Sequence, residues 1–179
     1  IVRALRESFA GDRIDAVSGI LNGTSNFVLT GMNRTGRSFS EVLAEAQALG
    51  YAEADPTADV GGSDAACKLA LLARIAFGQD VPLEAVSTTG ITGLTPVDLE
   101  YARMLKRTPR QLGIARRLAD GRLLLSVRTH LVAETTMLAR VDGPFNAVEV
   151  RTAHGGELVF TGRGAGGDPT ATAVLSDVV

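Results

Sequence analysis

The 179-residue sequence predicts a single α+β domain, with a mixed β-sheet and helices packed mainly on one face. Helical and extended hydrophobic patterns are interspersed irregularly along the chain, which argues against a regular series of βαβ units. No internal repeat or low-complexity linker divides the sequence, and its 45% hydrophobic residues are enough for one core. We therefore expect residues 1–179 to form one domain.

Helices are expected where apolar residues recur at intervals of three or four positions. Ser38 followed by Glu41 has the spacing of a capping box, which favours a helix start at this point. Thr24 and Ser25 are candidate caps for an earlier helix, and Pro96 suits the first turn of a later one. The expected helices are residues 2–10, 26–33, 38–49, 64–77, 96–106 and a last helix from residue 168 onward.

Strands are expected where short runs rich in β-branched and apolar residues stand between turn-forming residues. The first run ends in Asn22-Gly23, a pair that is typical of turns. The last two runs are joined by residues 153–156, a spacing that predicts a hairpin. The expected strands are residues 14–21, 86–91, 112–118, 123–128, 147–152 and 157–161.

The charge balance and the cysteine content exclude some classes of protein. Eighteen Lys and Arg against 20 Asp and Glu leave a net charge of −2, so we expect neither nucleic acid nor an anionic membrane as a partner. No run approaches the roughly 20 apolar residues of a membrane-spanning helix. The single cysteine, Cys67, cannot form an intrachain disulfide framework, so a reducing compartment, the cytoplasm, is expected.

Three further side chains are candidates for reactive or metal-binding groups. Cys67 follows two alanines in the helix predicted for residues 64–77, so we expect a small buried side chain rather than a nucleophile. His130 and His154 lie far apart in the sequence, which favours surface or turn positions over a metal pair. We therefore expect no metal site in this chain.

An acidic loop leads into the helix predicted for residues 64–77. Asp64 falls in the first turn of that helix and Lys68 lies one turn further on the same face. A lysine held among carboxylates keeps its proton and can donate it to a carbonyl oxygen as a general acid. One alternative is a solvated loop with an ordinary helix ion pair worth about 0.3 to 0.5 kcal/mol. Another is calcium, although the spacing is not that of an EF-hand. The charged residues of the loop and of the first two turns of the helix are Glu53, Asp55, Asp59, Asp64 and Lys68.

A glycine-rich run occupies residues 162–167, near the C-terminus. A dinucleotide fold carries its G-x-G-x-x-G fingerprint between a first strand and a helix, so this run is in the wrong place for one. It is either the exit from a hairpin or a backbone contact with a phosphate or a cofactor.

Long stretches of the sequence resemble the homoserine dehydrogenase family. They are GILNGTSNFVLTGM, residues 19–32, and EAQALGYAEADPTADVGGSDAACK, residues 45–68. The resemblance continues in residues 143–150 and 162–179 and is weaker over residues 103–140, so it covers nearly the whole chain. The family signature within the second stretch consists of Gly50, Asp55-Pro56, Asp59, Gly62, Asp64 and Lys68.

The resemblance implies an NAD- or NADP-dependent oxidoreductase that interconverts L-homoserine and L-aspartate 4-semialdehyde in threonine and methionine biosynthesis. It implies that residues 1–179 are the substrate-binding, catalytic and dimerisation domain of a homodimer. The family's nucleotide-binding domain, a further catalytic lysine and a monovalent-cation loop all lie upstream of a point equivalent to Ile1. We therefore expect the cofactor to be bound mainly by that missing domain and this chain alone to be inactive.

The resemblance also implies roles for individual residues. Lys68 is the expected proton donor and Asp64 its partner at the reacting oxygen, while Glu53 is expected to bind the amino group of the substrate. Gly166 is expected to approach the cofactor. The alternative is a non-catalytic module that binds an amino acid through its acidic loop or self-associates through apolar strands such as residues 123–128 and 147–150. The other residues expected around the substrate are Gly23, Thr24, Tyr51 and Asp59.

Overall fold

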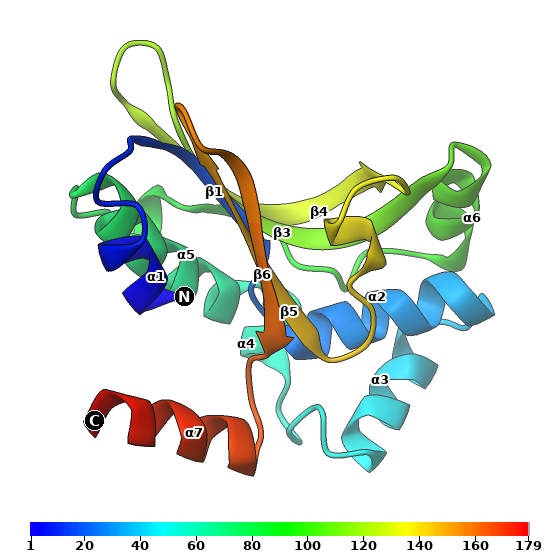
Figure 1. Ribbon diagram of the computed structural model, residues 1–179. Coiled ribbons are helices and arrows are strands. Elements are labelled where there is room, and N and C mark those ends of the chain that lie inside the picture. The colour runs from blue at the N-terminus through cyan, green and yellow to red at the C-terminus, as the bar shows by residue number, and fades with distance from the viewer. Residues whose placement is uncertain (179) are drawn as a thin grey trace.

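A computed structural model describes residues 1–178 as one mixed six-stranded sheet with helices against it (Figure 1). The strand order is β2-β4-β3-β1-β5-β6, with β2 parallel to β4 and every other neighbouring pair antiparallel. The expected α+β class is therefore confirmed. The strands are β1 Ile14–Ile20, β2 Ser87–Thr88, β3 Arg107–Arg117, β4 Leu123–Ala133, β5 Phe145–Thr152 and β6 Gly156–Arg163.

The helices lie mainly below the sheet in Figure 1, as the sequence predicts. The capping box is confirmed, because the Ser38 side chain accepts from the Glu41 backbone N–H and the Glu41 side chain accepts from the Ser38 N–H. The hairpin between β5 and β6 is also confirmed. The α-helices are α1 Val2–Glu7, α2 Gly23–Thr35, α3 Phe39–Ala48, α4 Thr57–Gly61, α5 Ser63–Phe77, α6 Pro96–Met104 and α7 Gly167–Val178, and the 3-10 turns are η1 Leu83–Ala85 and η2 Leu138–Arg140.

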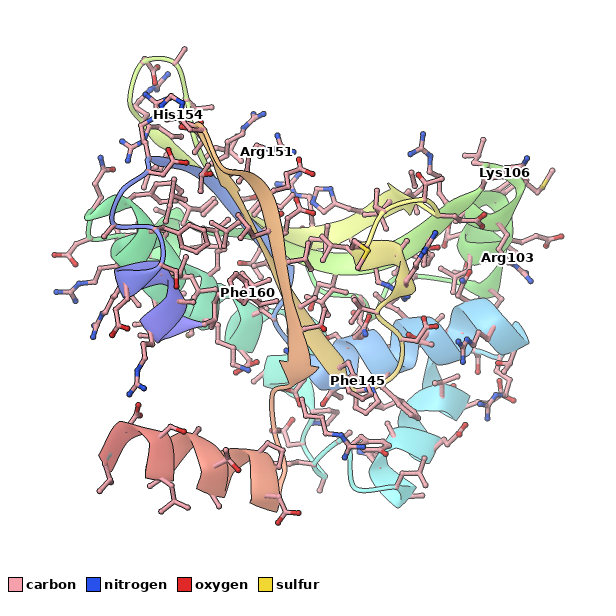
Figure 2. All side chains as sticks on the ribbon, in the orientation of Figure 1. Arg103, Lys106, Phe145, Arg151, His154 and Phe160 are labelled. Carbon is pink, nitrogen blue, oxygen red and sulfur yellow. The ribbon has the colours of Figure 1, made fainter. Side chains whose placement is uncertain are left out.

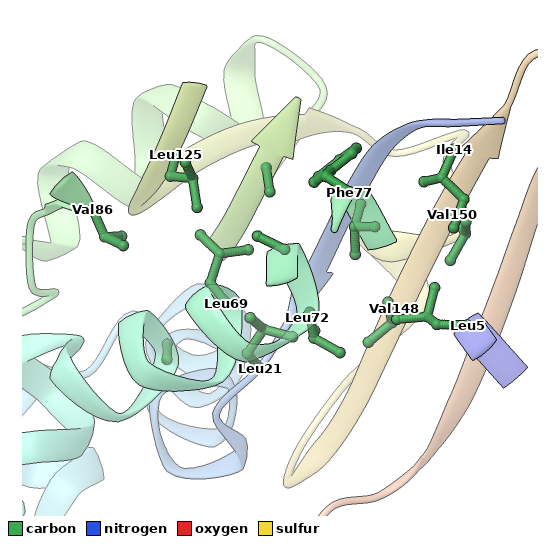
Figure 3. Close-up of a cluster of buried hydrophobic side chains, with 14 of the residues drawn as sticks. Leu5, Ile14, Leu21, Leu69, Leu72, Phe77, Val86, Leu125, Val148 and Val150 are labelled. Carbon is green, nitrogen blue, oxygen red and sulfur yellow. The ribbon is translucent and has the colours of Figure 1, made fainter. Parts of the chain in front are cut away.

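The main hydrophobic core lies between α1, α5 and one face of the sheet (Figure 3). Leu69 and Leu72 of α5 pack there with Val17 of β1 and Val150 of β5, and all of them are buried. A second cluster joins α2, α3, α4 and α6 beyond the end of β1. Because α5 is fixed to the sheet by this core, the helix presents its N-terminal turn at the point where β1 ends.

Two expectations about the ends of elements are wrong. The cap of α2 is Asn22 rather than Thr24 or Ser25, because the Asn22 side chain accepts a hydrogen bond from the Ser25 backbone N–H at 2.8 Å. The strand expected at residues 86–91 shortens to β2. Ile91 N–H donates to the Val60 carbonyl of α4 at 2.8 Å, so the chain turns away from the sheet.

The expected burial of Cys67 is also wrong, since its side chain is exposed. On α5 the residues that face the sheet include Ala65, Ala66 and Leu69, and Cys67 lies on the other side of the helix. The exposure of Cys67 is therefore determined by its position on the helix more than by the tendency of cysteine to be buried. His154 lies in the exposed β5–β6 turn, as expected (Figure 2).

Candidate active site

A cleft of about 410 Å³ opens where β1 ends, between the start of α2, the loop after α3, α5 and the segment after β6. All the residues to which the resemblance assigns a role line this one cleft. They come from four separate stretches of the chain, which the fold brings together. The predicted residues are Gly23, Thr24, Tyr51, Glu53, Asp59, Asp64, Lys68 and Gly166.

Asp64 and Lys68 form an ion pair at the wall of the cleft. Lys68 Nζ donates to Asp64 Oδ2 at 2.7 Å and to the Leu21 carbonyl at 3.2 Å. The Lys68 side chain is 48% exposed and that of Asp64 is 30% exposed, so the ion pair contributes little to the stability of the fold. An ammonium group has three N–H donors, which leaves one for an oxygen atom of a ligand in the cleft.

The start of α2 and the loop after α3 form another side of the cleft. Thr24 Oγ1 donates to the Tyr51 carbonyl at 2.6 Å, and the Phe27 and Tyr51 rings pack with centroids 5.0 Å apart. From α3, Gln47 Nε2 donates to the Glu53 carbonyl at 3.1 Å. The backbone of Glu53 is thus held in place while its exposed carboxylate lines the cleft.

The acidic loop divides into two parts with different surroundings. Asp55 does not line the cleft; its Oδ1 accepts from the Thr57 N–H at 3.1 Å and the Thr57 hydroxyl at 2.6 Å. These hydrogen bonds, first of all that from the hydroxyl, lower the pKa of Asp55 below its ordinary value of 3.8. Asp55 therefore shapes the entry to α4, whereas Glu53, Asp59 and Asp64 face the cleft.

Asn22 contacts both carboxylates that reach the cleft from α4 and α5. Its Nδ2 group donates to Asp59 Oδ1 at 2.6 Å and to Asp64 Oδ2 at 2.8 Å. Asn22 was not among the residues predicted from the sequence, because Asn-Gly after a strand is an ordinary turn signal. Because Asn22 stands three residues before Ser25, the sequence could have predicted it as the helix cap. It could not have predicted the contacts with the two carboxylates.

The glycine-rich run forms the far wall of the cleft, together with a loop before β5. A Cβ at Gly164 would lie 2.5 Å from Asn146 Oδ1, so the Asn146 side chain packs directly against the backbone of this glycine. The loop is held by Asn26, whose Nδ2 group donates to the Val141 and Gly143 carbonyls at 2.8 and 2.9 Å. The lining residues of this wall that the sequence analysis missed are Pro144, Asn146, Arg163, Gly164 and Ala165.

Gly62 lets α5 begin close to the sheet. It adopts φ +88° between α4 and α5, and a Cβ there would lie 3.1 Å from both Gln111 Nε2 and Thr88 Cγ2. This turn sets the position of the next residues, including Asp64.

Over residues 1–178, no group of three or more His, Cys, Asp or Glu side chains could hold a metal ion. None of the helices in that range is long and apolar enough to cross a membrane.

Comparison with known proteins points to one family. The homoserine dehydrogenase family profile matches residues 1–179. A homoserine dehydrogenase of Mycobacterium leprae is 49% identical over 183 residues, which cover 100% of this chain and 42% of that protein. The chain thus spans about two fifths of the length of such relatives.

Solved structures agree with this match. The crystal structure of a homoserine dehydrogenase from Thiobacillus denitrificans has a TM-score of 0.96 and 47% identity, over 99% of this chain and 41% of that one. A hyperthermophilic archaeal homoserine dehydrogenase in complex with NADPH has a TM-score of 0.82 and 28% identity, over 99% of this chain and 50% of that one. By sequence and by structure, the chain belongs to the homoserine dehydrogenase family.

Proposed function

We propose that this chain is the substrate-binding and catalytic part of an NAD(P)-dependent homoserine dehydrogenase, which interconverts L-homoserine and L-aspartate 4-semialdehyde. The observation that carries the proposal is the single cleft in which Lys68, Asp64 and Glu53 meet the glycine-rich run. The proposal includes the place of this reaction in threonine and methionine biosynthesis. The single cysteine supports a reducing compartment such as the cytoplasm.

The charges of the cleft match those of the amino-acid substrate. Glu53 offers a carboxylate to the substrate ammonium group. Within residues 1–178 this carboxylate has no hydrogen-bond or ion-pair partner, so it is available to a ligand. At the other wall, Arg163 supplies a guanidinium group beside Gly164, which suits a carboxylate or a phosphate. Thr24 and Tyr51, joined by a hydrogen bond, line the same cleft.

Lys68 is suited to move the proton of the reaction. When the substrate aldehyde is reduced, its oxygen gains negative charge, and an N–H of Lys68 aimed into the cleft donates a proton to it. Asp64 keeps the ammonium group in place through the 2.7 Å contact. Because Lys68 is 48% exposed, water can replace the proton after each turnover. In the reverse direction Lys68 accepts the proton of the homoserine hydroxyl.

NADPH or NADH supplies the hydride when bound, and the far wall of the cleft fits part of such a cofactor. Gly166 adopts φ +120° and lines the cleft with Gly164, so at these two positions the backbone faces the space with no side chain in between. This supports the expected contact of Gly166 with the cofactor. We infer that most cofactor contacts belong to a part of the enzyme outside this chain, because the chain spans only about two fifths of the length of its relatives. The family resemblance assigns any monovalent cation to that part as well.

The proposal is tested by joining this chain to a nucleotide-binding domain. In a chimera, the chain replaces the matching segment of the Thiobacillus denitrificans homoserine dehydrogenase, with which it shares 47% identity. We expect the chimera to oxidise homoserine with NAD or NADP and the isolated chain to be inactive. The isolated chain should still bind homoserine in calorimetry. A folded chimera without activity, with no homoserine binding by the chain, would favour a non-catalytic module instead.

We also propose that the chain forms a homodimer through the sheet face opposite α5. This face carries Ile114, Leu124 and Arg128, which line a second cavity of about 460 Å³. Leu124 is 39% exposed there. Arg116 and Arg128 lie toward the β3–β4 side of the face and Glu149 on β5, so a second copy related by a two-fold axis can bring opposite charges together.

A further inference from the structure

Asn22 occupies the turn between β1 and α2 and contacts both carboxylates beside Lys68. We propose that Asn22 is a positioning residue for proton transfer: its amide bridges Asp59 and Asp64 and holds Asp64 against Lys68. The kinetic part of this inference rests on the proposed dehydrogenase function. The geometric part concerns only contacts within this chain.

The orientation of the Asn22 amide is fixed by its role as helix cap. Its Oδ1 accepts the Ser25 backbone N–H at 2.8 Å, so its Nδ2 group must point the other way, toward the cleft. A flipped amide would turn Nδ2 toward a donor and Oδ1 toward two carboxylates, which places like partial charges together. The start of α2 therefore determines to which groups in the cleft the Asn22 amide can donate hydrogen bonds.

The two protons of Nδ2 bridge two carboxylates that would otherwise repel each other. They are donated to Asp59 Oδ1 at 2.6 Å and to Asp64 Oδ2 at 2.8 Å. Asn22 is only 6% exposed, so water does not easily replace these donors. Removal of the amide would therefore leave two neighbouring carboxylates free to rotate apart.

The same turn also holds the lysine. Asp64 Oδ2 accepts from Asn22 Nδ2 and from Lys68 Nζ, so rotation of this carboxylate moves the lysine as well. The carbonyl of Leu21, the residue before Asn22, accepts from Lys68 Nζ at 3.2 Å. Residues 21 and 22 thus orient both members of the pair, one through its backbone and the other through its side chain.

Two substitutions separate the capping role from the positioning role. Serine and aspartate both cap helices well, so Asn22→Ser and Asn22→Asp keep the acceptor for Ser25 but lose both amide donors. In the chimera we expect kcat to fall about tenfold or more in both variants, as for a small misplacement of a catalytic group. Circular dichroism should show the same helix content as the parent chimera.

The aspartate variant adds a pH signature. It places a third carboxyl group beside Asp59 and Asp64, facing Lys68, while Glu53 and Arg163 are the other charged groups lining the cleft. Protonation of one of the three carboxyl groups removes a negative charge and restores an O–H donor. We therefore expect kcat of Asn22→Asp, relative to the parent, to recover partly as the pH is lowered.

A spectroscopic measurement on the chain itself needs no activity. Lys68 and Lys106 are the only lysines in the sequence, so ¹³C-lysine labelling gives one Cε signal for each. We expect the Lys68 signal to move toward that of Lys106 in Asn22→Ser, while the Lys106 signal stays in place. Ser38→Asp, which puts a carboxylate at the cap of α3, is the matched control and should change neither signal nor kcat.

The outcomes distinguish this inference from the proposed function. If Asn22 is only a cap, both variants keep kcat within about twofold and the Lys68 signal does not move, which overturns the inference. Failure of both variants to fold also overturns it, because the residue is then structural. An inactive parent chimera contradicts the proposed function, and the Lys68 signal in Asn22→Ser then decides the positioning role.

Discussion

Lys68 is one of only two lysines, and its surroundings differ sharply from those of Lys106. Lys68 contacts Asp64 and a backbone carbonyl inside the cleft, whereas Lys106 lies exposed beyond the end of α6 (Figure 2). The ion pair with Asp64 is too exposed to contribute much to folding, as is usual for surface ion pairs. We therefore expect substitution of Lys68 to affect chemistry far more than stability.

Lys68→Ala in the chimera removes the proposed proton donor. We expect kcat to fall by about 10² to 10⁴, the usual scale for loss of a general acid, with an unchanged thermal unfolding midpoint. Lys106→Ala is the control and should keep kcat near the parent value. A folded Lys68→Ala chimera with near-normal kcat would show that Asp64 and Lys68 form only an ordinary helix ion pair without a catalytic role.

Glu53 and Asp55 are neighbouring acids with different expected effects. Glu53→Gln keeps the side-chain shape but removes the charge proposed to face the substrate ammonium, so KM for homoserine should rise more than kcat falls. Asp55→Asn removes a charge outside the cleft and should leave KM unchanged. The measurement is the steady-state KM of each variant chimera. Equal rises in KM for Glu53→Gln and Asp55→Asn would show that the effect comes from the overall negative charge of the loop and not from a specific contact of Glu53.

At the level of elements, Asp12 ties the turn before β1 to the hairpin between β5 and β6. Its Oδ2 accepts the backbone N–H groups of His154 and Gly155 at 3.1 and 2.8 Å. These hydrogen bonds, that from Gly155 first, lower the pKa of Asp12 from 3.8 to about 2. A single carboxylate thus joins two elements that are far apart in the sequence.

The lowered pKa of Asp12 predicts a pH dependence of stability. A carboxyl group with a lower pKa in the folded state stabilises that state above the unfolded pKa, and this contribution is lost as the pH falls through the folded pKa. The chain should therefore lose this stability between pH 3.8 and about 2. Asp12→Asn should show a shallower loss across the same window in urea unfolding. Identical slopes for the two proteins would contradict the assignment.

At the level of the whole molecule, the helices cover mainly one face of the sheet and leave much of the other open. The exposed apolar side chains and the separated charges of that open face are the basis for the proposed homodimer. Burial of such a face excludes water from apolar surface, which is the main driving force for association.

The dimer is tested by charge insertion on that face. Leu124→Asp should shift sedimentation at tens of micromolar from dimer to monomer, because it replaces apolar contact surface in the interface with a hydrated charged group. Leu71→Asp is the matched control on α5, where Leu71 is 61% exposed and lies outside the face. A parent chain that sediments as a monomer, or equal effects of both substitutions, would count against this interface.

Local patterns in the sequence determined most elements of this protein. The spacing of apolar residues predicted α5, and the Ser38–Glu41 capping box predicted the start of α3, because both depend on neighbours within one or two helical turns. The resemblance to homoserine dehydrogenase supplied the residues of the cleft. Only the tertiary structure decided how Asn22, Asn146 and Arg163 join them. Asn22, for example, donates to Asp59, 37 residues further along the chain, and side-chain contacts at such a separation leave no periodic signal in the sequence.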